Sequence, residues 1–491
     1  MRGAGILLPI TSLPSPYGVG TLGRAARDFV DFLSRSGQTY WQILPICPTG
    51  YGDSPYQSAS SYAGNPYMID LDELSAAGLL KPEEYREICW GEDERNVDYE
   101  LLYHQRFDVL RIAAGRIEGE LYRRFERFCA GQKDWLDDYA LFMAIKSEEE
   151  GRSWQTWPEE VRLRKPEVLA ALTEELQEEV CFWKQLQFLF FEQWAELKRY
   201  ANERNIKMIG DLPIYVAEDS SDVWSHPEQF WLDENLTPVK VAGVPPDAFS
   251  EDGQLWGNPL YRWDFMKQDG YTWWKKRIAY QTEIYDVLRF DHFRGFDQYF
   301  AVPYGETTAK SGEWMDGPGI EFFRTMEASL GTLPVIAEDL GYLTPSVLKL
   351  LEDTGFPGMK VLAFAFDSRD TGFGYKPHCY TRNCVVYTGT HDNDTILGWF
   401  ETARPEDVRK TIAYFGLTEE EGYGRGMIRA AWASVADTAI IPFADLIGQG
   451  SEGRINTPST LGGNWTYRCL AEDFTDELAT ELKEAMELYE R

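Results

Sequence analysis

The sequence predicts an α/β protein folded as a single (β/α)8 TIM barrel, and three observations support this fold class. Eight short apolar segments suited to strands are spread along the 491 residues. Segments with helical spacing of apolar residues separate them, and neither internal repeats nor low-complexity tracts interrupt the alternation. A barrel with insertions is large enough to contain the whole chain, so we expect residues 1–491 to form one domain.

The expected strands are, in chain order, residues 5–10, 40–46, 207–216, 287–291, 334–341, 359–367, 384–394 and 438–446. After the first of them, Ala26, Phe29, Val30 and Leu33 recur at helical spacing, and Gly37 stands where that helix would end. Strand, loop and helix alternating in this way indicate parallel strands that close into a barrel.

Two insertions into this alternation are predicted. Residues from about 72 to 165 are rich in Glu, Arg, Leu and Tyr at helical spacing, which indicates a helical insertion after the second strand. A helix over about 168–205 then turns one apolar stripe toward the sheet. The second insertion, about 217–275, separates the third and fourth strands and has the composition of an active-site loop.

Composition excludes several classes of function. The net charge of -32 disfavours DNA, RNA and anionic lipid, because each is bound mainly through Lys and Arg. No apolar run approaches the roughly 20 residues that cross a membrane. Seven scattered cysteines without a CxxC pair indicate neither a zinc site nor a disulfide framework. The apolar N-terminal run has no cleavage site after it, so we expect a cytoplasmic protein.

The stretch from Val287 to Phe296 contains the strongest candidate for a reactive group. If residues 287–291 are extended, Arg289 and Asp291 project from the same face at the carboxyl end of the strand. A neighbouring guanidinium lowers the pKa of an aspartate, which suits a carboxylate that attacks as an anion. Asp291 is therefore the candidate nucleophile, and a plain ion pair that closes the strand is the alternative.

Acids close five of the eight expected strands: Asp211, Asp291, Glu338, Asp367 and Asp392. In a barrel these ends surround one opening, where the active sites of this fold lie. Paired carboxylates favour glycoside chemistry, in which one acid attacks the anomeric carbon and another protonates the leaving oxygen. A magnesium site is the main alternative, but aromatic residues dominate the loops and no phosphate-binding loop follows the last strands. We therefore expect neither a metal nor a cofactor.

Five motifs occur in the order of successive barrel strands. They are Gly210-Asp211-Leu212-Pro213-Ile214-Tyr215-Val216, the segment 243–259, Arg289-Phe290-Asp291-His292-Phe293-Arg294-Gly295, Ala337-Glu338-Asp339-Leu340-Gly341 and Thr390-His391-Asp392-Asn393-Asp394-Thr395. In these motifs the sequence resembles the 4-α-glucanotransferases, also called amylomaltases or disproportionating enzymes, which are relatives of the α-amylase barrels. The resemblance covers nearly the whole chain and matches the short form of the family. Tyr467 departs from it, because relatives more often carry tryptophan there.

The resemblance implies that Asp291 is the nucleophile, Glu338 the general acid/base and Asp392 a third carboxylate that holds hydroxyl groups of the donor sugar. Arg289 and His391 would support these acids. The other substrate-binding residues that it implies are Ser54, Tyr56, Asp211, Trp256, Asp367 and Asn456. Structural alternatives exist, since Glu338 could bond a neighbouring loop and Asp392 could cap the next helix.

The function implied by the resemblance is transfer of α-1,4-glucan segments from a donor maltodextrin to an acceptor glucose or glucan, by a retaining double displacement. A hydrolase with the same carboxylates and a non-catalytic glucan-binding protein are the alternatives. The segment 243–258, with Pro245-Pro246, Phe249 and Trp256, is expected to overhang the barrel opening and to favour a sugar over water as acceptor. The sequence leaves the oligomeric state open.

Overall fold

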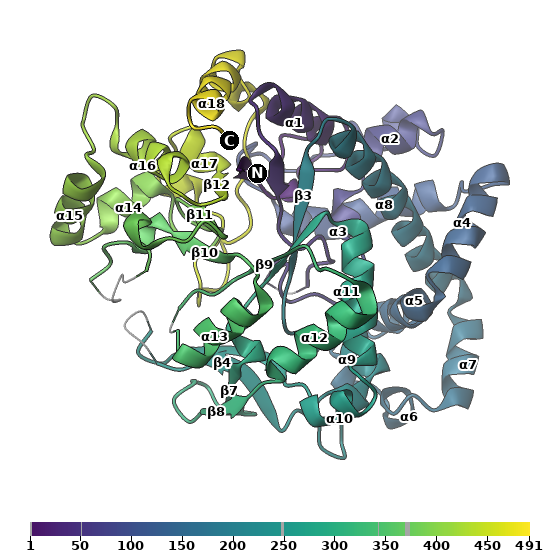
Figure 1. Cartoon of the computed structure of the whole chain (residues 1–491). Coiled ribbons are helices and arrows are strands. Elements are labelled where there is room, and N and C mark those ends of the chain that lie inside the picture. Colours follow the sequence, from purple (N-terminus) through teal and green to yellow (C-terminus); the bar gives the residue numbers. More distant parts are fainter. Residues whose placement is uncertain (1, 51, 247–249, 342, 369–373) are drawn as a thin grey trace.

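The structure is a computed structural model that describes residues 2–50, 52–246, 250–341, 343–368 and 374–491. Eight parallel strands close into a barrel in the order β1-β12-β11-β10-β9-β6-β3-β2, near the centre of Figure 1. These strands are β1 (Gly3–Leu7), β2 (Tyr40–Gln42), β3 (Lys207–Leu212), β6 (Val287–Phe290), β9 (Val335–Ala337), β10 (Gly358–Val361), β11 (Cys384–Tyr387) and β12 (Thr438–Pro442). The predicted (β/α)8 fold class is confirmed.

All eight strands end earlier than the segments expected for them, and in two cases a candidate acid lies well beyond its strand. β10 ends at Val361 and passes into a 3-10 helix, Leu362–Phe364, so Asp367 lies beyond the strand and not at its end. β11 ends at Tyr387, which leaves Asp392 in the following loop. The apolar residues past β10 remain buried under the surrounding loops, and an apolar run alone cannot distinguish that burial from a longer strand.

The segment after β2 is helical, as residues 72–165 indicate. Its helices are α2 (Leu71–Ala76), α3 (Tyr99–Ala114), α4 (Gly119–Gly131), α5 (Lys133–Glu148) and α6 (Glu159–Arg162), which lie together at the right of Figure 1. The single helix expected over 168–205 is two helices, α7 (Pro166–Glu175) and α8 (Gln177–Glu203), separated at Leu176. Only α8 buries an apolar stripe, against β3 and the neighbouring helices.

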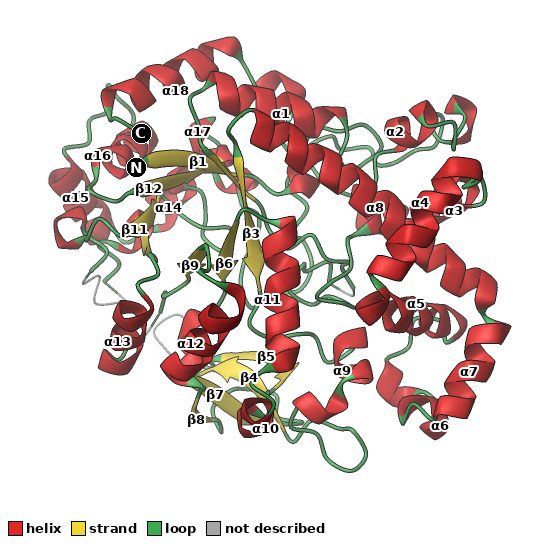
Figure 2. Ribbon diagram, turned by 45° about the vertical axis from the view of Figure 1, so that its right-hand side comes forward, coloured by secondary structure: helices red, strands yellow, loops and turns green. Residues whose placement is uncertain are grey.

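A second sheet, which the sequence analysis did not predict, lies beside the barrel. Its antiparallel strands run in the order β5-β4-β7-β8, visible below the barrel in Figure 2. They are β4 (Lys240–Val244), β5 (Gln254–Pro259), β7 (Gln298–Pro303) and β8 (Glu313–Asp316). The expected loop insertion over 217–275 therefore contains a hairpin, together with α9 (Ser221–Ser225) and α10 (Trp263–Gln268). Its prolines, glycines and half-exposed residues hide the strand pattern in the sequence.

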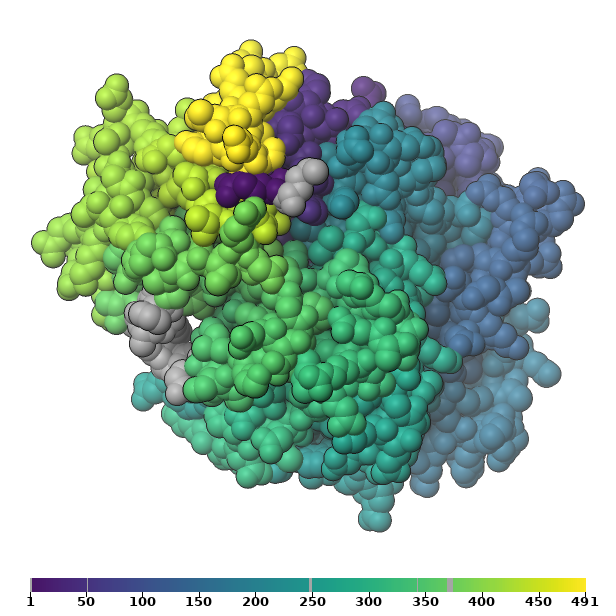
Figure 3. All heavy atoms as spheres, viewed as in Figure 1, coloured from purple at the N-terminus to yellow at the C-terminus, as the bar shows by residue number. Residues whose placement is uncertain are grey.

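The remaining helices cover the outside of the barrel. They are α1 (Arg24–Arg35), α11 (Thr272–Ile284), α12 (Gly319–Leu330), α13 (Pro345–Thr354), α14 (Ile396–Thr402), α15 (Pro405–Phe415), α16 (Tyr423–Ala433), α17 (Phe443–Leu446) and α18 (Asp476–Leu488). The two ends of the chain lie side by side, where α18 packs against α1 (Figure 3). No helix within the described ranges has both the length and the apolar character needed to cross a membrane.

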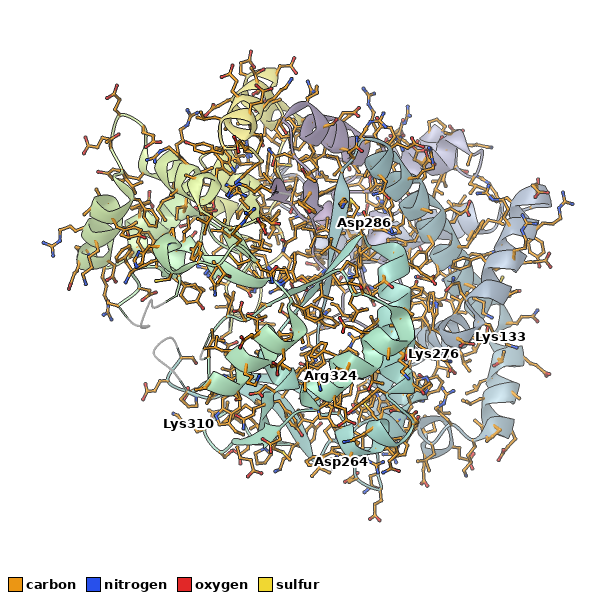
Figure 4. All side chains as sticks on the ribbon, in the orientation of Figure 1. Lys133, Asp264, Lys276, Asp286, Lys310 and Arg324 are labelled. Atoms are coloured by element: carbon orange, nitrogen blue, oxygen red, sulfur yellow. The ribbon has the colours of Figure 1, made fainter. Side chains whose placement is uncertain are left out.

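Close packing around β3 explains one of the sequence motifs. A Cβ atom on Gly210 would lie 2.3 Å from the ring of Tyr285, so only glycine lets this ring pack on the strand beside Asp211. The next residue, Asp286, lies just beyond the end of α11 and is labelled in Figure 4, and its carboxylate accepts the N–H of Met208 in β3 at 2.8 Å. These contacts fix the strand that carries Asp211.

One buried cation attaches the helical insertion to the loop after β2. Arg106 in α3 is 0% exposed and donates to the carbonyls of Tyr67 at 3.0 Å and Ile69 at 2.5 Å. Burial lowers the pKa of Arg106 to about 10, which leaves it charged at neutral pH. The insertion is therefore anchored through backbone oxygens.

We expect Arg106→Met to lower the free energy of unfolding by about 3 kcal/mol, because it leaves buried carbonyls without a donor. Urea denaturation measures the change. Arg123→Met is the matched control, since the Arg123 side chain in α4 is 64% exposed and pairs with Glu120 of its own helix. Equal stability of the two variants would show that Arg106 does not anchor the insertion.

Candidate active site

Asp291 and Glu338 leave neighbouring barrel strands at the same level. Phe290 of β6 pairs with Ala337 of β9, and the two acids are the next residues on each strand. The N–H of Glu338 donates to the carbonyl of Phe290 at 3.0 Å, which continues the strand pairing to this point. Both side chains therefore lie at the carboxyl end of the barrel, where this fold carries its active sites. The separation of about 5 Å that a retaining glycosidase requires stays a prediction.

Two backbone amides orient the Glu338 carboxylate. Oε2 accepts the N–H of His292 at 2.7 Å, and Oε1 accepts the N–H of Leu340 at 2.8 Å. His292 adopts a left-handed backbone, with φ 52° and ψ 48°, which is uncommon for a residue with a side chain. This conformation directs the N–H of His292 toward the Glu338 carboxylate. His292, the residue after Asp291, therefore connects the two acids through its backbone.

Arg289 pairs with two carboxylates, those of Asp211 and Asp291. Its Nη1 donates to Asp211 at 2.8 and 2.7 Å and lies 3.0 Å from Oδ1 of Asp291. The side chains of Arg289 and Asp211 are 4% and 0% exposed. Burial lowers the pKa of Arg289, but the charges of Asp211 and Asp291 outweigh it and raise that pKa well above its ordinary value. Arg289 is thus a permanent cation beside the nucleophile candidate.

Tyr56 connects this cluster to the opposite side of the opening. Its hydroxyl donates to Oδ2 of Asp211 at 2.7 Å and lies 3.0 Å from Nε2 of His391. Because the tyrosine hydroxyl donates its proton to Asp211, its oxygen can only accept from His391. Nε2 of His391 is therefore protonated and donates to the tyrosine oxygen. The two rings stack at 5.3 Å, and burial lowers the pKa of His391, which keeps this imidazole neutral.

Asp392 is held beside His391 by the C-terminal segment. Its Oδ1 accepts from Nδ2 of Asn456 at 2.7 Å and lies 3.4 Å from Nε2 of His391. Nη2 of Arg454 donates to the backbone carbonyl of Asp392 at 2.9 Å. The Asp392 side chain is 44% exposed, more than the 27% of Asp291, so its carboxylate is accessible from the opening.

Arg289 acts to lower the pKa of Asp291, as expected, but the net lowering that the sequence predicted is wrong. Burial raises that pKa to about 7, and the repulsion from Asp211 and Asp392 adds to it, although Arg289 acts in the lowering direction. Burial and the charge of Asp291 likewise raise the pKa of Glu338 to about 8. The two acids therefore interact strongly, so their protons are lost in two steps that belong to the pair.

The remaining predicted residues differ in what they contact. Trp256 of β5 lies edge-on, at 4.8 Å, to the ring of His292, the residue that follows Asp291. Ser54 accepts the N–H of Tyr56 at 3.3 Å and so shapes the loop that presents this tyrosine. Asp367 is 6% exposed beyond β10, and its N–H donates to the carbonyl of Phe364 at 3.4 Å.

The segment expected to overhang the opening is only partly described. Pro245 and Pro246 follow β4, and Trp256 reaches His292 from the paired strand β5. Phe249, which was expected to contribute a stacking surface, lies outside the described residues. The contact of Trp256 supports a position of this hairpin at the edge of the site.

Several groups were missed by the sequence analysis. His292 lies inside a motif, but its left-handed backbone has no signature in the residue type. Trp465 lies 5.8 Å from the ring of Tyr56 and 6.0 Å from that of His391, although it is more than 70 residues away in sequence from either.

Among the described residues, no group of three or more His, Cys, Asp or Glu is arranged to hold a metal ion.

Comparison with known proteins identifies the family of this chain. A family model described as 4-alpha-glucanotransferase matches residues 8–472. The 4-alpha-glucanotransferase of Clostridium butyricum is 50% identical over 484 residues, which cover 98% of this chain and 99% of that protein. The 4-alpha-glucanotransferase of Synechocystis is 48% identical over 497 residues, which cover 100% of this chain and 98% of that protein. A solved structure, the amylomaltase from Streptococcus agalactiae in complex with acarbose, is 42% identical with a TM-score of 0.98 over 100% of both chains. This chain belongs to the 4-alpha-glucanotransferase family.

Proposed function

We propose that this protein transfers segments of α-1,4-glucan from a donor maltodextrin to an acceptor glucose or glucan by a retaining double displacement. The observation that carries the proposal is the pair of acids Asp291 and Glu338, which follow adjacent strands and have pKa values raised to about 7 and about 8. When two carboxyl groups interact so strongly that one is ionised while the other keeps its proton, the ionised group can act as nucleophile and the protonated group as general acid. The names of the relatives support glucan as the substrate.

Asp291 is the nucleophile and Glu338 the general acid/base in this proposal. The ionised Asp291 attacks the anomeric carbon while Glu338 gives its proton to the leaving glycosidic oxygen. The deprotonated Glu338 then takes the proton of the acceptor hydroxyl as that oxygen displaces Asp291. Two inversions at the same carbon restore the α configuration. The amides of His292 and Leu340 hold Glu338 in one orientation for both steps.

The other groups bind and orient the donor sugar. Asp392 is the accessible carboxylate for its hydroxyl groups, and the neutral ring of His391 lies beside it. The Arg289 cation stabilises Asp291 as an anion and as the leaving carboxylate of the second step. Asp211, Tyr56 and Trp256, with Ser54, Asp367 and Asn456, complete the proposed binding site. Absence of a metal or cofactor and a cytoplasmic location stay predictions.

Substitution of the two acids should have different effects. We expect Asp291→Ala to abolish turnover and the covalent intermediate, whereas Glu338→Gln should still be glycosylated slowly by glucosyl fluoride, whose leaving group needs no proton. Mass spectrometry of the peptides of Glu338→Gln detects the attached sugar. A sugar attached to any residue other than Asp291 would make the assignment of the nucleophile wrong.

The pH dependence of kcat/KM should be bell-shaped. Activity should fall as pH drops through about 7, because protonated Asp291 cannot attack, and as pH rises through about 8, because ionised Glu338 cannot donate. The two limbs belong to the interacting pair of acids. With glucosyl fluoride as donor, Glu338→Gln should lose the alkaline limb and keep the acidic one. Persistence of the alkaline limb in this variant would exclude Glu338 as its source.

Transfer and hydrolysis are distinguished by the number of reducing ends. Maltotriose should be converted to glucose and longer α-1,4 chains, and each bond cleaved should be replaced by one bond made. The total of reducing ends should therefore remain nearly constant while glucose accumulates. Trp256 at the edge of the site supports an acceptor sugar over water. A total that rises in step with glucose would show water to be the normal acceptor and favour the hydrolase alternative.

A further inference from the structure

The loop that carries His391 and Asp392 is fixed at both ends by one side chain, that of Asp445 in α17. Its Oδ2 accepts from the Thr388 hydroxyl at 2.5 Å, and its Oδ1 accepts the N–H of Ile396 at 2.7 Å. Thr388 is the first residue after β11, and Ile396 is the first residue of α14. One carboxylate therefore joins the start of the loop to its end.

Asp445 is placed where a carboxylate is costly to bury. It is 4% exposed and Thr388 is 0% exposed, and no salt bridge to Asp445 occurs in the described part of the chain. Burial raises the pKa of Asp445 to about 6, and the nearby charge of Asp394 acts in the same direction, although both hydrogen bonds oppose it. The two bonds to the loop are what offsets this cost.

The middle of the same loop is held from the segment that follows α17. The N–H of Asn456 donates to the carbonyl of His391 at 3.1 Å, and Arg454 donates to the carbonyl of Asp392 at 2.9 Å. With its backbone bonded at both ends and in the middle, the loop has one position relative to the barrel. Asp445 bonds both ends of the loop through one side chain, and the Thr388 carbonyl also accepts the N–H of Ala363 at 3.1 Å.

We propose that Asp445 is a positioning residue for glucan transfer: by joining the two ends of loop 388–396 it sets where the Asp392 carboxylate and the His391 ring lie relative to the two catalytic acids. Asp445 itself touches neither substrate nor reacting atoms. The inference rests on the role proposed above for Asp392.

The chemistry of the two bonds predicts which substitutions the loop tolerates. In Asp445→Asn, the amide oxygen can still accept the N–H of Ile396, and the amide nitrogen can donate to the Thr388 hydroxyl, which can accept as well as donate. In Asp445→Ala, both groups of the loop lose their partner. Thr388→Val removes one of the two bonds with little change of shape.

The chain offers a matched control in Asp70. This carboxylate is 5% exposed, accepts from the Thr21 hydroxyl at 2.6 Å and accepts the N–H of Glu73 at 2.9 Å. It caps α2 in the helical insertion, and its backbone groups bond Gln193 of α8. Asp70→Ala therefore removes the same kinds of bond without acting on the loop of Asp392.

The experiment measures kcat and KM for maltotriose, together with hydrogen exchange of the amides in loop 388–396. We expect Asp445→Ala to lower kcat by about 10²-fold, as misplacement of a catalytic group by about 1 Å does, with faster exchange in the loop. Asp445→Asn should restore most of kcat. Asp70→Ala should lower the melting temperature and leave kcat unchanged.

The inference is overturned if Asp445→Ala keeps the wild-type kcat, or if Asp70→Ala lowers kcat to the same extent. Should Asp445→Ala fail to fold, Thr388→Val and its control Thr21→Val decide, because the first must lower kcat and the second must not. Asp392→Asn separates this result from the proposed function. If Asp392→Asn is fully active, the role of Asp392 is wrong; if it is inactive while Asp445→Ala and Thr388→Val are normal, only the positioning role is wrong.

Discussion

One buried guanidinium is shared between two carboxylates in this site, and the placement of the other groups depends on it. Arg289 donates to both oxygens of Asp211 and lies 3.0 Å from Asp291. Arg289 and Asp211 are almost fully buried, so the loss of either would leave an unpaired charge away from water. Asp211 and Asp291 therefore compete for one cation, and the nucleophile is only partly stabilised as an anion.

From this cluster, a continuous set of contacts crosses the opening of the barrel. Tyr56 links Asp211 to His391, and His391 adjoins Asp392, which is bonded in turn to Asn456. Apart from Asp211 in β3, these groups come from loops that follow different strands, so the strand ends provide only their starting points. Hydrogen bonds from buried side chains and amides then fix each loop, which is how a barrel with short strands maintains a precise site.

The sequence predicted the eight strands and the acids because an apolar run that leads to a carboxylate is a local pattern. Properties that depend on residues far apart in the sequence, such as burial and the hydrogen bonds between loops, could not be predicted in the same way. The pKa of Asp291 was predicted with the wrong sign, since the neighbouring Arg289 is visible in the sequence but burial is not. The second sheet, the left-handed backbone of His292 and the bonds of Asp445 to its loop likewise arise only from the folded chain.

The most direct test of the shared guanidinium is the acidic limb of kcat/KM in the variant Asp211→Asn. The substitution removes a negative charge that raises the pKa of Asp291 and leaves Arg289 with one carboxylate as its partner. The account predicts that the acidic limb moves to lower pH than in the wild-type protein, whatever the change in the maximum rate. An acidic limb that stays in place, or moves to higher pH, would contradict it.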